Sequence, residues 1–113
     1  VYKRQVVALL DPSTSFNKDI VKAVRGAVDA LPYNADVIWV FNSTNVDAIE
    51  EIVPSIRPGE HLLMNGKGLA RDCGASSLPV LIMVNKDGVV KNVNLGANNE
   101  VQNIVLQTMA LMK

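Results

Sequence analysis

The sequence predicts a single α/β domain built on a mixed β-sheet. Three observations indicate this class. Apolar runs of β-type residues alternate with amphipathic helical stretches in the first half of the chain, which is typical of parallel strands joined by helices. The turn signal at Asn85 to Gly88 then joins two runs directly, as in an antiparallel hairpin. Pro79 stands immediately before one of these runs, where a strand begins, because proline cannot donate to a β-ladder.

Length and composition favour one folded domain over residues 1–113. Apolar residues make up 49% of the 113 residues and charged residues 19%, so the chain has enough apolar surface for a core and is not disordered. The formal net charge is zero, and nothing therefore points to nucleic acid or to anionic lipid. No apolar run approaches the roughly 20 residues that span a bilayer. The first residue is Val1, and we expect a processed protein or part of a longer one.

Helices and strands alternate in the first half of the chain. Arg4 to Leu10 and Ala35 to Phe41 read as buried strands, and Phe16 to Leu31 between them has helical spacing of its apolar residues. Because a helix joins these strands, we expect them to be parallel. Thr44 and Asp47 resemble a capping box that starts a short helix.

The second half predicts further strands and two more helices. A short extended piece, a turn with a brief helix, a hairpin of two strands and a C-terminal helix are expected at His61 to Met64, Asn65 to Cys73, Val80 to Leu95, and beyond Gly96 to Asn99. Polar residues in the last strand of the hairpin indicate a partly exposed edge. The hairpin requires one strand to run against the others, so the sheet is mixed, and we expect helices on both of its faces.

This order of elements resembles the thioredoxin fold. The stretch LARDCGASSLPVLIMVNKDGVV is similar to the part of that family which runs from a short helix through a cis-proline into the β-hairpin. The additional segment between Thr44 and Asn65 resembles the insertion of the thiol–disulfide oxidoreductase and peroxiredoxin branch. The resemblance implies a three-layer α/β/α sandwich with a mixed four- to five-stranded sheet. It also favours an extracytoplasmic setting in a bacterium.

The resemblance places the family's chemistry between the first strand and the first helix. A CxxC pair or a single peroxidatic cysteine lies there, because the helix dipole and free N–H groups lower the pKa of a thiol. This chain has Asp11 to Asn17, DPSTSFN, at that place and no cysteine. An alcohol is too weak an acid to replace a thiolate, so the family's dithiol exchange and peroxide reduction have no nucleophile here.

The resemblance leaves a groove as the candidate binding site. We expect the Leu78–Pro79 peptide bond to be cis and to face the loop after the first strand. An extended peptide or a partner protein would lie between the two sides. The predicted groove residues are Ser13, Thr14, Ser15, Phe16 and Asn17 on one side, and Ser77, Leu78 and Pro79 on the other.

The remaining candidate residues favour ordinary structural roles. Cys73, the one cysteine, reads as a small core residue, with a regulatory or mixed-disulfide thiol as the alternative. His61, the one histidine, reads as a surface residue. One cysteine and one histidine cannot supply four zinc ligands, and we expect neither a metal nor a cofactor. Asn65 to Gly68 lacks the full phosphate-loop spacing and reads as a turn.

Three functions remain open at this point. The first is a redox-inactive thioredoxin-like domain that acts as a protein- or peptide-binding or structural module. The second is a thiol–disulfide oxidoreductase-like protein whose redox cysteine is missing or replaced, or which uses Cys73 alone. In the third, the domain is part of a longer protein and supports a neighbouring domain. All three rest on analogy at the level of the fold.

Overall fold

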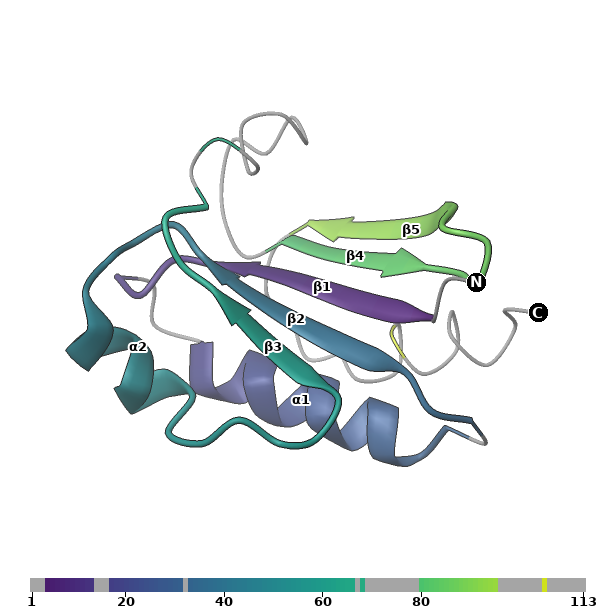
Figure 1. Ribbon diagram of the computed structural model, residues 1–113, viewed down its shortest axis with the longest axis horizontal. Helices are drawn as coiled ribbons and strands as arrows, with labels where there is room; N and C mark the ends of the chain where they lie inside the picture. The colour runs from purple at the N-terminus through teal and green to yellow at the C-terminus, as the bar shows by residue number, and fades with distance from the viewer. Residues whose placement is uncertain are drawn as a thin grey trace.

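The computed structural model describes residues 4–13, 17–31, 33–66, 68, 80–95 and 105 (Figure 1). Their central feature is a five-stranded sheet in the order β3-β2-β1-β4-β5. The strands are β1 (Gln5–Leu10), β2 (Asp36–Phe41), β3 (Glu60–Leu63), β4 (Val80–Val84) and β5 (Val90–Leu95). The pairs β1–β2 and β2–β3 are parallel, whereas β1–β4 and β4–β5 are antiparallel. The predicted mixed sheet is therefore confirmed, and the predicted extended piece forms its edge strand β3.

Two helices are described, α1 (Asn17–Asp29) and α2 (Val46–Ile52). The prediction extended the first helix to Leu31, but the chain tightens after Asp29. The Leu31 N–H donates to the carbonyl of Val28 at 3.1 Å, three residues back, which is a common way for a helix to end. The predicted capping box at Thr44 is wrong by one residue. The N-cap of α2 is Asn45, whose side chain accepts the N–H of Ala48 at 3.3 Å.

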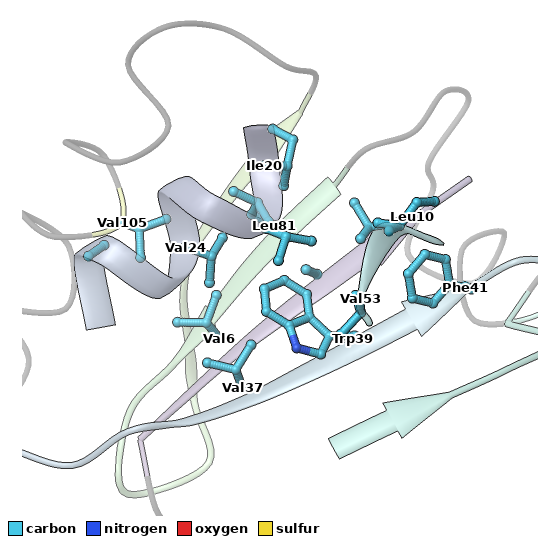
Figure 2. Close-up of a cluster of buried hydrophobic side chains, with 14 of the residues drawn as sticks. Val6, Leu10, Ile20, Val24, Val37, Trp39, Phe41, Val53, Leu81 and Val105 are labelled. Carbon is cyan, nitrogen blue, oxygen red and sulfur yellow. The ribbon is translucent and has the colours of Figure 1, made fainter. Parts of the chain in front are cut away.

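The main core lies between the sheet and these helices (Figure 2). Alternate residues of the strands point into it, as the period of two along a strand requires. Buried side chains of the strands, of both helices and of Val105 form one cluster, which includes Val6, Ile20, Val24, Trp39, Phe41, Ile49, Leu81 and Val105. Both described helices therefore cover the same face. The brief helix predicted at Leu69 to Cys73 lies outside the described residues, and the predicted helical layer on the second face stays a prediction.

The second face carries a smaller cluster. Leu9, Val40 and Val80 are buried there, with three partly buried aliphatic residues packed against them. None of the described helices is long and apolar enough to cross a membrane.

The predicted hairpin between β4 and β5 is confirmed, and Asn85 shapes its turn. Asn85 is 5% exposed, and its Oδ1 accepts the N–H groups of Asp87 at 2.9 Å and Val89 at 3.0 Å. Gly88 follows with φ +80°, a backbone conformation that favours glycine. β5 begins at Val90, one residue later than predicted, and its register with β4 shifts between Met83 and Val84.

Candidate binding site at the carboxyl ends of the parallel strands

The loops that follow β1 and β2 meet at the carboxyl ends of these parallel strands. Leu10 pairs with Phe41 in the parallel register, and the Asn42 N–H donates to the Leu10 carbonyl at 3.1 Å. Asp11 follows β1 directly, as Asn42 follows β2. Carboxyl ends of parallel strands are the usual place for ligand sites in α/β sheets.

Asp11 connects these two loops through its carboxylate. Its Oδ1 accepts the backbone N–H of Ser13 at 2.9 Å and the Ser13 hydroxyl at 2.7 Å. Its Oδ2 accepts the side-chain amide of Asn42 at 3.2 Å. The carboxylate therefore holds the turn before α1 and joins it to the end of β2, 31 residues further along the chain.

Asn17, the first residue of α1, adds a hydrogen bond to the backbone of this loop. Asn17 is 4% exposed, and its Nδ2 donates to the backbone carbonyl of Asp11 at 2.7 Å. A buried amide is stable only when its polar atoms are hydrogen-bonded. Asn17 thus fixes where the loop meets the helix, whereas Ser13 is exposed.

A hollow of about 490 Å³ opens beside this network. It lies between the loop after β1 and the loop that leads into α2, and it is lined by Asp11, Pro12, Ser13, Asn42, Ser43, Asn45 and Ala48. Sequence reasoning named only Ser13 among these as a site residue. The signal for the others was the position of Asn42 and Ser43 directly after a strand parallel to β1.

A third loop, after β3, packs against the second. The Asn65 N–H donates to the Ser43 carbonyl at 3.1 Å, and the Gly66 N–H donates to the Phe41 carbonyl at 2.8 Å. Asn65 has φ 60°, a conformation that asparagine tolerates better than most residues. The predicted turn at this position is confirmed for Asn65 and Gly66. It brings a third loop to the carboxyl ends of the parallel strands.

The described polar side chains that line this hollow are neutral hydrogen-bonding groups, together with the carboxylate of Asp11. They offer hydroxyl and amide groups, which suit recognition of a peptide backbone. His61 lies elsewhere, on β3, paired with Ile38. Within the described ranges, no three His, Cys, Asp or Glu side chains gather as metal ligands.

Several predicted site residues fall outside the part of the chain that the structure describes. These are Thr14, Ser15, Phe16, Ser77, Leu78 and Pro79, and Cys73 with them. The expected cis peptide bond between Leu78 and Pro79 also belongs to this group.

A second polar cluster lies under the other end of α1. Glu60 accepts hydrogen bonds from Arg25 Nε at 2.9 Å, Arg25 Nη2 at 2.7 Å and Trp39 Nε1 at 3.1 Å. Burial raises the pKa of Glu60, but hydrogen bonds from Arg25, Trp39 and the Arg57 backbone outweigh it and leave the pKa below its usual value. The groups satisfy one another, so this cluster joins α1 to β2 and β3.

Comparisons with known proteins concern the fold. No protein-family model matches the sequence, and no curated protein matches it. Solved structures do match. DsbF from MTB has a TM-score of 0.78 over 100% of this chain and 83% of its own, at 17% sequence identity. The chain has a thioredoxin-like fold.

Two other thioredoxin-like structures support this assignment. A secreted Mycobacterium tuberculosis disulfide oxidoreductase homologous to E. coli DsbE has a TM-score of 0.71 at 16% identity, over 97% of this chain and 82% of its own. The exposed lipoprotein thioredoxin Etrx1 of Streptococcus pneumoniae has a TM-score of 0.70 at 15% identity, over 95% and 83%. At this identity the likeness establishes the thioredoxin-like fold alone. The single cysteine of this chain is Cys73.

Proposed function

We propose that this thioredoxin-like domain is a binding module without dithiol redox activity. It holds an extended peptide or a partner protein at the carboxyl ends of β1 and β2, beside the Pro79 loop. The observation that carries the proposal is the Asp11 network. Between β1 and α1, where the resemblance places redox cysteines, Asp11 instead bonds Ser13, Asn17 and Asn42.

The geometry of the hollow supports a peptide ligand. Loops fixed on the ends of rigid strands are common binding sites, and exposed amides and hydroxyls can pair with backbone groups of an extended chain. Asp11 and Asn17 are engaged in shaping the loop. Ser43 and Asn45 line the hollow without being buried. Their side-chain oxygens accept the N–H groups of Asn45 and Ala48, so we expect the Ser43 hydroxyl and the Asn45 side-chain NH₂ to be the donors that contact a ligand.

Thiol–disulfide exchange is the second candidate, favoured by the oxidoreductases among the structural neighbours. In this chain it would have to use Cys73 alone. A single thiol can form a mixed disulfide with a substrate, but it has no second thiol in the chain to release that substrate.

An insulin-reduction assay with dithiothreitol separates the two candidates. We expect the protein to give no acceleration over dithiothreitol alone, and Cys73→Ser to behave in the same way. A protein with a CxxC motif serves as the positive control. Clear turnover that disappears in Cys73→Ser would establish the second candidate and reject the first.

Binding is tested with reduced, carboxymethylated α-lactalbumin, an unfolded chain whose thiols are blocked. We expect it to shift backbone amide NMR signals of residues 11, 13 and 42–45. Ala48→Gln, which fills the hollow, should weaken binding about fivefold, or about 1 kcal/mol. Glu50→Gln, on the exposed side of the same helix, is the matched control. Shifts confined to other regions, or equal affinity of both variants, would contradict the proposed site.

A further inference from the structure

A second hollow lies at the opposite end of the parallel strands, where α1 ends and β2 and β3 begin. Figure 1 shows where these three elements end and begin. The volume of this hollow is about 530 Å³, in the range of pockets that hold small organic groups. Val28, Leu31, Ala35 and Pro58 give it an apolar wall. Such a wall suits an alkyl stem better than a hydrated inorganic ion.

The polar groups of this hollow are unequal in their engagement. Arg57 forms an ion pair with Asp29, so these two charges neutralise each other. Asp36 is half-buried, and its carboxylate has no hydrogen bond or ion pair with the described residues. Gly59 lies beside it, since a Cβ built on Gly59 would be 3.7 Å from Asp36 Oδ1. Among the described charges that line this hollow, Asp36 is therefore the one that remains available to a ligand.

Arg4, another described cation near Asp36, has its guanidinium over an aromatic ring. The guanidinium of Arg4 lies 3.9 Å from the centroid of the Tyr33 ring, at a cation–π distance. Arg4 reaches Asp36 through its backbone, whose carbonyl accepts the Asp36 N–H at 2.9 Å.

The end of α1 adds to the negative potential of the hollow. The helix ends at Asp29 and has no basic residue in its last turn. Its carboxyl-terminal end carries the negative end of the helix dipole, which favours a nearby cation. Because Asp29 neutralises the charge of Arg57, Arg57 repels a second positive group beside Asp36 only weakly.

We propose that this hollow binds an organic cation, an ammonium or guanidinium group on an alkyl stem. The stem lies against Val28, Leu31 and Pro58, and the cationic head pairs with Asp36. A free small amine and a lysine or arginine side chain of a partner protein share this chemistry. The proposal is independent of the peptide site at the carboxyl ends of β1 and β2.

An NMR titration of the whole protein tests it with three probes. N-acetyl-lysine methylamide represents a protein side chain, agmatine represents a small free cation, and N-acetyl-norleucine methylamide is the uncharged control. We expect the cationic probes to shift backbone amides of residues 28–31, 33–36, 57 and 59, more weakly at high salt, and the control to leave them unchanged. The tighter of the two cationic probes identifies the source.

Two matched variants show whether Asp36 is the counter-charge. Asp36→Asn should lower the affinity for the cationic probes at least about fivefold, because it removes the charge without changing the shape. Asp47→Asn, an exposed carboxylate on α2, should leave it unchanged. Melting curves check that both variants fold. Equal affinity for Asp36→Asn, equal binding of the norleucine probe, or shifts along the acidic side of α2 instead would overturn the proposal.

Discussion

Glu60 occupies the most buried of the described ion pairs. Its side chain is 5% exposed and that of its partner Arg25 is 20% exposed. Four donors converge on its two oxygens, because Arg25 supplies two, Trp39 one, and the backbone of Arg57 another at 3.2 Å. Arg25 also donates to the Ser55 carbonyl at 2.7 Å. A carboxylate without these partners would be costly to bury.

Glu60→Gln should therefore destabilise the protein by about 3 kcal/mol at pH 7, because Arg25 loses its counter-charge in a partly buried place. Urea unfolding measures this, and the exposed Glu50→Gln should stay within about 0.5 kcal/mol of the parent. Equal midpoints for the two variants would show that solvent replaces the lost charge.

The same residue predicts a pH dependence. The pKa of Glu60 is lower in the folded protein than in the unfolded chain. At acidic pH the unfolded chain therefore binds more protons at this residue than the folded protein does, and protonation favours unfolding. Its contribution to stability is complete above the unfolded pKa of about 4.3 and is lost as pH falls through the folded pKa. Unfolding measured from pH 7 to pH 3 should therefore show a smaller acid loss in Glu60→Gln than in the parent protein. Parallel curves would contradict this assignment.

At the scale of elements, the turn after β3 is determined by how closely it approaches β2. A Cβ on Gly66 would lie 2.4 Å from Val40 Cγ1 and 3.4 Å from the Phe41 carbonyl oxygen. Val40 is buried on β2 and the carbonyl belongs to the backbone, so neither neighbour can yield easily. Only glycine allows the two backbones this distance.

Gly66→Ala should lower the free energy of unfolding by about 1–3 kcal/mol, the usual cost of overpacking. Gly68→Ala is its matched control, because a Cβ there would meet no atom within 4 Å. Thermal or urea unfolding of both variants checks the difference. A Gly66→Ala protein as stable as Gly68→Ala would mean that the turn does not pack on β2 in this way.

At the scale of the whole molecule, the strand order makes β1 the centre of the sheet. β1 pairs with β2 on one side and β4 on the other, whereas β3 and β5 form the edges (Figure 1). The peptide site and the cation hollow lie at opposite ends of the parallel strands, and both are built from loops attached to these strands. The stability of the sheet therefore positions both sites.

Native-state hydrogen exchange should follow this order. We expect amides of β1 to exchange only with global unfolding, and those of β3, a four-residue edge strand, to exchange by local opening. NMR-detected exchange measures both. Protection of β3 equal to that of β1 would show that another segment covers this edge.

The sequence by itself determined the strands, the parallel pair, the hairpin and the thioredoxin-like class. The strands, the parallel pair and the hairpin follow from apolar runs of β-type residues, from the geometry of a strand–helix–strand unit, and from Asn85 to Gly88, all of which are local. The thioredoxin-like class follows from the resemblance of the chain to that family. Strand bounds differed from the prediction by one residue, as in β2 and β3.

Only the tertiary structure decided which polar groups meet. Asp11 and Asn42 are 31 residues apart, and Arg25 and Glu60 are 35 apart. Their contact depends on the register of β1, β2 and β3 and on how α1 lies across them. Local pattern does not encode such distant pairs, because each residue alone reads as an ordinary turn or surface residue. The same reason hid Asp36, whose carboxylate forms no hydrogen bond or ion pair with the described residues.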